Sequence, residues 1–161
     1  MIPPIVGIIP LFIVFKTLGL NDTFQGLILA YTSFNLPFTV WILRGFFLEL
    51  PKEIEEAALI DGATYFNILR KIVVPLSFPA IITTATLSLI QSWNEFIFAV
   101  FLTSQEIKTI PILIASFIGD QQYFWNELTA ASVIALIPVF ILVLLVQKQL
   151  IRGLTFGVVK G

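Results

Sequence analysis

The chain has 161 residues, of which 58% are hydrophobic and only 12% are charged, well below the ~25% charged residues of an ordinary soluble domain. This composition and a mean hydropathy of +0.99 exclude a soluble globular enzyme and indicate a chain whose main solvent is lipid. The sequence contains no Cys and no His, so it cannot build a disulfide framework, a thiol nucleophile, a histidine-based metal site or a His-centred triad. We therefore expect an all-α polytopic membrane protein without a catalytic residue or a metal site, and the net charge of −1 gives no reason to expect nucleic acid.

The first two apolar segments differ in length. Residues 2–15 would form a helix of only ~21 Å, shorter than the ~30 Å hydrocarbon core of a bilayer, and they contain three prolines. We expect this segment to be the end of a crossing that begins upstream, so that the chain is N-terminally truncated. Residues 24–47 form a nearly uninterrupted apolar run that is long enough to span the membrane with some tilt.

The segment from residue 48 to 74 is polar enough to be a loop between two crossings, and it predicts two short helices. Pro51 suits the first helical position, and Gly62 can take the left-handed conformation that ends a helix. Thr64 could cap the helix that follows.

One side of the first short helix carries the small residues Ala57 and Ala58, which would let another protein approach the backbone closely. The alternative is a helix that packs only beneath its own bundle, with Gly62 as a plain cap. Composition alone leaves both interpretations open.

The apolar run of residues 79–102 predicts a second full crossing, which contains an ionisable residue, Glu95. Asp at the centre of a spanning helix costs about 2.5–3.5 kcal/mol on translocon scales, so a carboxylate there needs a reason. Polar residues recur at helical spacing along this run and form one stripe, which would face protein or water: Thr84, Ser88, Gln91 and Glu95, with Ser92 and Asn94 at its border. The stripe either lines a pathway for a hydroxyl-rich substrate or joins helices by hydrogen bonds worth about 0.6 kcal/mol each.

Asn35 is a further candidate for the pathway, because Pro37 nearby frees a backbone carbonyl near the middle of the membrane that must be satisfied inside the protein. For Asn35 we favour a packing role. Gly26 and Ala30 are small residues four apart, which permit close contact between helices.

The remaining segments predict one short element and a third full crossing. Residues 109–118 are too few to span and too apolar for a free loop, so we expect them at the outer interface or dipping inward; residues 128–146 are long enough to span.

If the loop 48–74 is cytoplasmic, the inner side holds seven of the nine basic residues and the outer side only Lys16 and Lys108. The inner basic residues are Arg44, Lys52, Arg70, Lys71, Lys148, Arg152 and Lys160. This imbalance predicts a multi-pass protein of the cytoplasmic membrane with a cytoplasmic C-terminus.

The loop carries a spaced motif: Glu56-Ala57-Ala58, Gly62, Ile72 and Pro75. This spacing resembles the cytoplasmic "EAA" loop in the membrane subunits of ATP-binding-cassette importers, with Val74 where that pattern more often has Leu. The segments Trp93-Asn94-Glu95-Phe96 and Gly153-Leu154-Thr155 look like the maltose-type, carbohydrate-importing branch of that family. The resemblance covers essentially the whole chain.

The resemblance implies that the chain is the C-terminal part of a six-helix permease fold, with three full spans and a partial first one. It implies a short coupling helix that docks in a cleft of a separate ATPase and carries the coupling residues Glu56, Ala57, Ala58, Asp61 and Gly62. It also implies an ATPase dimer, a second permease subunit and an extracytoplasmic sugar-binding protein as partners. We expect no cofactor on this chain, with ATP and Mg²⁺ on the partner ATPase.

None of the nine glycines begins a GxxxxGK[ST] phosphate-binding loop, so we expect a transport subunit that is not itself an enzyme. The candidate pathway residues are Asn35, Ser88, Gln91, Asn94 and Glu95. Two other functions stay open: an ion-coupled secondary transporter or channel that uses Glu95, and a membrane scaffold that recruits a soluble protein through the loop. We also expect the 161 residues alone not to support transport.

Overall fold

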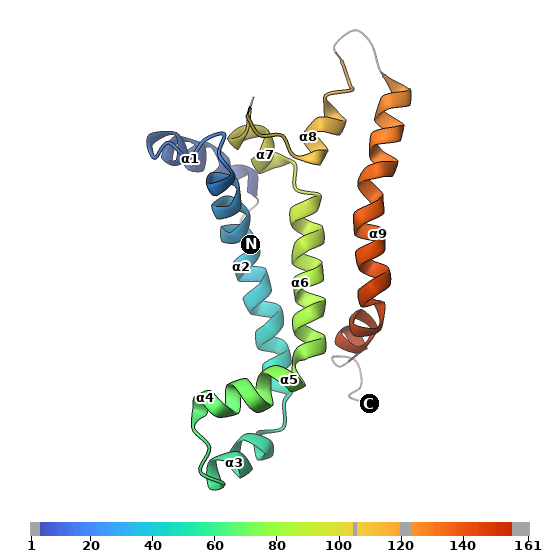
Figure 1. Cartoon of the computed structure of the whole chain (residues 1–161). Coiled ribbons are helices and arrows are strands. Elements are labelled where there is room, and N and C mark those ends of the chain that lie inside the picture. Colours follow the sequence, from blue (N-terminus) through green and yellow to red (C-terminus); the bar gives the residue numbers. More distant parts are fainter. Residues whose placement is uncertain (1–3, 105, 120–123, 156–161) are drawn as a thin grey trace. The chain divides into compact units, whose positions relative to one another are not determined.

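The structure is a computed structural model that describes residues 4–104, 106–119 and 124–155 of the chain. The described elements are helices joined by turns (Figure 1). In chain order they are α1 (Pro4–Thr17), α2 (Phe24–Glu49), α3 (Lys52–Ile60), α4 (Tyr65–Ile68), the π-helix η1 (Leu69–Val73), α5 (Val74–Leu76), α6 (Phe78–Trp93), α7 (Ile97–Leu102), α8 (Ile110–Ala115) and α9 (Trp125–Thr155). The expected all-α fold is confirmed.

Two of the expected crossings correspond to single long helices. The predicted run 24–47 lies in α2, and the predicted run 128–146 lies within α9, which extends beyond it at both ends. Both helices are long and apolar enough to cross a membrane. The expected partial crossing corresponds to α1, which has 14 residues and contains Pro10.

The second full crossing that we expected differs from the prediction. The run 79–102 is not one helix, because α6 ends at Trp93 and α7 begins at Ile97 after a short break. The helical spacing that we expected to continue through Glu95 therefore stops before it. In the segment 109–118, the structure places the six-residue helix α8.

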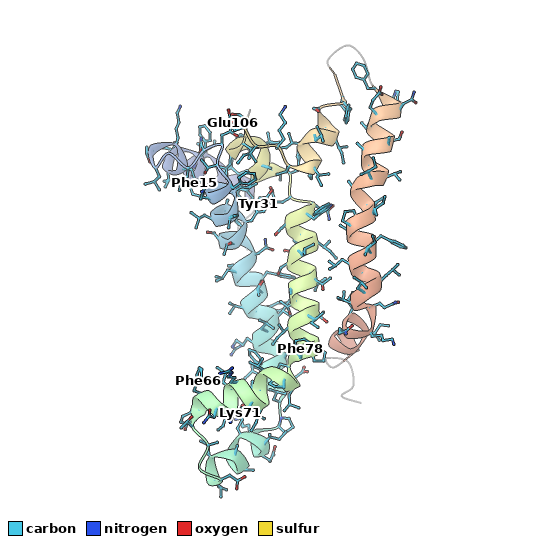
Figure 2. All side chains as sticks on the ribbon, viewed as in Figure 1. Phe15, Tyr31, Phe66, Lys71, Phe78 and Glu106 are labelled. Atoms are coloured by element: carbon cyan, nitrogen blue, oxygen red, sulfur yellow. The ribbon has the colours of Figure 1, made fainter. Side chains whose placement is uncertain are left out.

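The described residues divide into two compact units, and each is described by itself. Unit 1 takes the described parts of Met1–Leu36 and Leu89–Ile141, and unit 2 those of Pro37–Ser88 and Leu142–Gly161. The core of unit 1 joins side chains from α1, α2 and α7, and Figure 1 shows α1 and α7 side by side. Its buried members are Ile8, Phe15, Ala30, Phe98 and Leu102, of which Phe15 is labelled in Figure 2.

Gly26 has a different role from the one expected of it. A Cβ added at this position would lie 2.1 Å from the backbone oxygen of Leu20 and 3.2 Å from Oγ1 of Thr23, so the preceding turn, and not another helix, requires the glycine. Thr23 Oγ1 accepts a hydrogen bond from the Gly26 amide at 3.1 Å and donates one to Leu20 at 2.7 Å. Ala30 is fully buried in the core of unit 1, as a residue at a close helix contact should be.

Unit 2 has a small core of its own in the segment that joins α2 to α6. Ala58, Ile68 and Val73 are buried together, and Leu50, Ala63 and Ile72 pack against them. Elsewhere in this unit, Thr83 Oγ1 of α6 donates a hydrogen bond to the backbone oxygen of Gln149 on α9 at 3.1 Å.

Candidate functional site

The segment Leu50–Pro75 forms a helical hairpin whose two arms, α3 and α4, lie against each other in unit 2 (Figure 1). The first arm starts one residue later than the sequence predicts, since Pro51 is the residue that precedes the helix, with φ −61° and ψ 122°. Glu53 and Glu55 lie in the first turn, where negative charge complements the free backbone N–H groups.

The turn between the two arms is fixed by local hydrogen bonds. Gly62 has φ +81°, as expected, and its amide donates to the backbone oxygen of Leu59 at 3.0 Å, while the Ala63 amide donates to that of Ala58 at 3.0 Å. This pair of bonds is the Schellman ending of a helix, which favours glycine because an L side chain is strained at positive φ. Thr64 then caps α4, since its side chain accepts from the Asn67 amide at 3.4 Å, and this expectation is also confirmed.

The second arm widens into the π-helix η1 just before Pro75. Proline has no N–H, and its ring would clash with the carbonyl four residues earlier in a regular helix. In η1 the Val74 amide instead donates five residues back, to Leu69. The wider turn brings Ile68 and Val73, five residues apart, into the same buried cluster.

The two alanines of the motif lie in different environments. Ala58 is 8% exposed and packs inside the hairpin against Ile68 and Val73, whereas Ala57 is exposed. The expectation that both alanines line a surface open to a partner is therefore wrong for Ala58, because α4 and η1 cover it. The face of α3 turned away from the hairpin core is exposed and consists of Glu53, Glu56, Ala57 and Ile60.

Ser77 connects the hairpin to α6. The axis of Tyr65–Leu76 is bent by 71° from that of Phe78–Trp93, and Ser77 takes φ −85° and ψ 2° at the bend. The Ser77 side chain is 4% exposed, and its Oγ has no hydrogen-bond partner among the described residues.

In unit 1, Asn35 is a helix-joining residue. Its Nδ2 donates to Oγ of Ser92 on α6 and to the backbone oxygen of Tyr31, both at 3.0 Å. Its Oδ1 is buried and has no partner within the described part of the chain. This geometry agrees with the packing role that we favoured for Asn35.

Glu95 lies in the break between α6 and α7 and caps the start of α7. Its Oε1 accepts from the backbone amide of Phe98 at 2.8 Å and its Oε2 from that of Ala99 at 3.2 Å. Both amides belong to the first turn of α7, where intrahelical acceptors are missing, and both residues are buried. The carboxylate thus has a structural reason to be where it is: it supplies acceptors for amides that water does not reach.

The other predicted pathway residues differ in exposure and in their contacts. Gln91 and Asn94 are exposed in unit 1, and the Asn94 side chain donates to the Ile90 carbonyl of its own helix at 2.9 Å. Ser88 lies in unit 2, with its Oγ 2.9 Å from Oγ1 of Thr39 on α2.

Sequence reasoning missed two polar residues on α2, Tyr31 and Thr39, which lie four residues before and after Asn35. Thr39 is the partner of Ser88, and the Tyr31 hydroxyl lies 3.5 Å from the backbone oxygen of Glu95. Their regular spacing of four was a signal for a polar stripe on this helix.

Sequence reasoning also missed Asp22. It has φ +55°, which is unusual for a residue other than glycine, and it holds the segment after α7. Its carboxylate accepts from the amides of Ser104, Glu106 and Ile107 at 2.8, 3.1 and 3.2 Å. No local sequence pattern predicts these bonds, because the partners lie more than 80 residues away along the chain.

Comparisons with known proteins agree over almost the entire chain. The family described as "Binding-protein-dependent transport system inner membrane component" matches residues 1–156. The chain is 43% identical over 163 residues to the trehalose/maltose transport system permease protein MalG of Thermococcus litoralis, covering 100% of this chain and 59% of that protein. It is 40% identical over 164 residues to the trehalose transport system permease protein SugB of Mycobacterium tuberculosis, covering 100% and 60%. It is also 40% identical over 162 residues to the probable ABC transporter permease protein YurM of Bacillus subtilis, covering 100% and 54%. The chain thus spans little more than half the length of these relatives.

Proposed function

Because the chain belongs to the family of binding-protein-dependent transport system inner membrane components, we propose that it forms part of the permease subunit of an ATP-driven importer in the cytoplasmic membrane. Sugars or related small carbohydrates are the proposed substrates. Two relatives named as trehalose or trehalose/maltose permeases and one named as a sulfoquinovosyl glycerol permease support this class.

The observation that carries the proposal is the α3–α4 hairpin, which presents an exposed face on a rigid turn. Its inner side is filled by its own core, so the residues free to meet a partner are on the outer face: Glu53, Glu56, Ala57 and Ile60. We propose that this face docks in a cleft of a separate ATPase. Ala58 and Gly62 then act indirectly, by packing and ending the docking helix, while Asp61 lies exposed at its C-terminal end.

The energy required for coupling favours a packed joint over surface charges. Shifting a two-state equilibrium from 1:99 to 99:1 takes about 5.5 kcal/mol, whereas an exposed ion pair contributes roughly 0–1 kcal/mol. Ion pairs from Glu53 or Glu56 cannot supply this alone. The exposed apolar side chain of Ile60, beside the small Ala57, gives the outer face a surface suited to burial in a cleft.

The proposed complex has an ATPase dimer on the cytoplasmic side, a second permease subunit in the membrane and a sugar-binding protein outside. ATP and Mg²⁺ belong to the ATPase, and this chain transmits movement to the membrane helices. The count of seven basic residues against two supports a cytoplasmic hairpin and C-terminus. In the pathway we place Gln91 and Asn94 first, since their side chains are exposed and Asn94 bonds to its own helix. Asn35, Ser88 and Glu95 are instead engaged in part-buried contacts within the chain.

An ion-coupled transporter is not favoured. The family is described as a component of binding-protein-dependent transport systems, and one relative is named a probable ABC transporter permease. Both carboxylate oxygens of Glu95 already accept hydrogen bonds from backbone amides.

Single-cysteine crosslinking tests the docking, because the sequence has no Cys of its own. In inverted vesicles that hold the complete transporter, we expect Ala57→Cys on α3 to crosslink to the ATPase through a short bifunctional reagent. Ala85→Cys on α6 is the matched control, since Ala85 is exposed but lies outside the hairpin. The proposal fails if Ala57→Cys yields no ATPase adduct, or if a membrane-impermeant reagent added to right-side-out vesicles modifies it.

A further inference from the structure

The second arm of the hairpin, extended through η1 and α5, is oriented differently from α6, the apolar helix that follows it. Residues Tyr65–Leu76 run at 71° to α6, and only Ser77 separates the two. Spanning helices are tilted by about 20° on average from the bilayer normal. A helix bent by 71° from such a helix lies closer to the membrane plane than to the normal.

This arm has a second exposed face that the hairpin core does not use. Ile68 and Val73 point into the core against Ala58. Phe66, which is labelled in Figure 2, is 68% exposed and lies on the opposite side together with Arg70, one turn later. Tyr65 and Leu69 flank them and are exposed too.

Charge is divided between the two arms. The acidic residues of the hairpin are all on or directly after α3: Glu53, Glu55, Glu56 and Asp61. From Gly62 to Asn94 the sequence has no acidic residue, and its only charges are the exposed Arg70 and Lys71 on η1. An aromatic and aliphatic surface bordered by basic residues is what a helix resting on a membrane surface requires, because aromatic rings favour the headgroup level and cations attract anionic lipids.

We propose that the face formed by Tyr65, Phe66, Leu69 and Arg70 rests on the boundary between headgroups and acyl chains of the leaflet from which the hairpin emerges. This face is called the interfacial face below. The arm then separates two environments: α3 faces the aqueous side, and the interfacial face is held by phospholipid, with Arg70 and Lys71 beside anionic headgroups.

Continuity with α6 decides between lipid and a soluble protein as the occupant. The arm enters a spanning helix after one residue, so its interfacial face cannot move far from the bilayer surface. Leu76 and Phe78, on the two sides of Ser77, are exposed apolar side chains as well. The inference requires that α6 enters the membrane and does not require that the chain transports sugar or binds an ATPase.

Spin labelling of single cysteines in the full chain, reconstituted into phospholipid vesicles without any partner, tests the proposal. Labels at Phe66→Cys and Leu69→Cys should collide with oxygen, which partitions into lipid, and be shielded from a water-soluble nickel chelate. The control is Glu53→Cys on the outer face of α3, where nickel should dominate. We expect the ratio of oxygen to nickel collisions to be several-fold higher at the two interfacial positions than at Glu53.

One further variant and two contrary outcomes complete the test. In the double variant Arg70→Gln with Lys71→Gln, the label at position 69 should become more accessible to nickel in vesicles rich in phosphatidylglycerol, and change little in phosphatidylcholine alone. The proposal is overturned if the labels at 66 and 69 are as accessible to nickel as the label at 53. It is also overturned if they become shielded only after an ATPase is added, because the face would then dock a protein.

Discussion

Asp22 and Ser104, which are 82 residues apart, are joined by two hydrogen bonds: the Ser104 amide donates to Oδ1 at 2.8 Å and the Ser104 hydroxyl to Oδ2 at 2.7 Å. The Asp22 amide donates in turn to the backbone oxygen of Leu102 at 2.7 Å. One residue in the turn before α2 therefore fixes the path of the chain after α7. Bonds between a carboxylate and N–H groups are charge-assisted and stronger than neutral ones.

Asp22→Asn should loosen this connection. The Asn side chain keeps one acceptor oxygen but loses the charge. Bonds that now form to the second carboxylate oxygen are therefore lost, and bonds to the remaining oxygen lose their charge assistance; a hydrogen bond to a charged group contributes about 1.5–3 kcal/mol. We expect faster hydrogen exchange at the amides of Ser104, Glu106 and Ile107. Ser104→Ala, which removes only the hydroxyl bond, should have a smaller effect; equal exchange in both variants would contradict the role assigned to the carboxylate.

Gly26→Ala should destabilise the start of α2, because the new Cβ would lie 2.1 Å from the Leu20 oxygen, a contact that forces the backbone to move. Overpacking of this kind costs typically ~1–3 kcal/mol. Gly45→Ala on the same helix is the matched control, since an added Cβ there meets nothing within 4 Å and alanine is the better helix former. Thermal unfolding in detergent should show a lower midpoint only for Gly26→Ala.

Glu95→Gln should weaken the cap on α7, and it should not change how uptake depends on an ion gradient. Gln offers a single acceptor oxygen to two buried amides, and an unpaired buried donor costs about 1–3 kcal/mol. Hydrogen exchange at Phe98 and Ala99 should accelerate, while Glu127→Gln on α9, whose side chain is exposed, leaves it unchanged. If uptake driven by an ion gradient were lost in Glu95→Gln with the cap intact, the carboxylate would be an ion site after all.

Ala58→Leu should lower the stability of the hairpin, whereas Ala57→Leu, at the neighbouring position, should leave its stability nearly unchanged. Ala58 is buried against Ile68 and Val73, so a larger side chain overpacks the hairpin at ~1–3 kcal/mol and exposes it to proteolysis. Ala57 is exposed, so Ala57→Leu should change stability by less than about 0.5 kcal/mol. Under the proposed function, Ala57→Leu should nevertheless reduce ATP-driven uptake, because the larger side chain would fit less well in the cleft of the ATPase. Limited proteolysis and uptake by the complete transporter measure the two effects, and a stable Ala58→Leu hairpin would contradict the packing.

Features that depend on short stretches of sequence could be predicted from the sequence alone. Chain length and hydropathy locate α2 and α9, because the cost of leaving apolar side chains in water is local to each run. The hairpin turn was also predictable: Gly62 ends α3 and Thr64 caps α4 through bonds that span only a few residues. Its spaced motif allowed the family to be anticipated.

What escaped prediction depends on contacts between distant parts of the chain. The sequence by itself determined a helical membrane chain with a capped hairpin, since hydropathy and capping act over one or two turns of helix. Tertiary structure alone decided that Ala58 faces inward while Ala57 does not, that Asn35 meets Ser92, and that Asp22 holds Ser104. In each case the partner is set by how helices pack, and that packing optimises buried contacts over a whole unit, not over a window of neighbours.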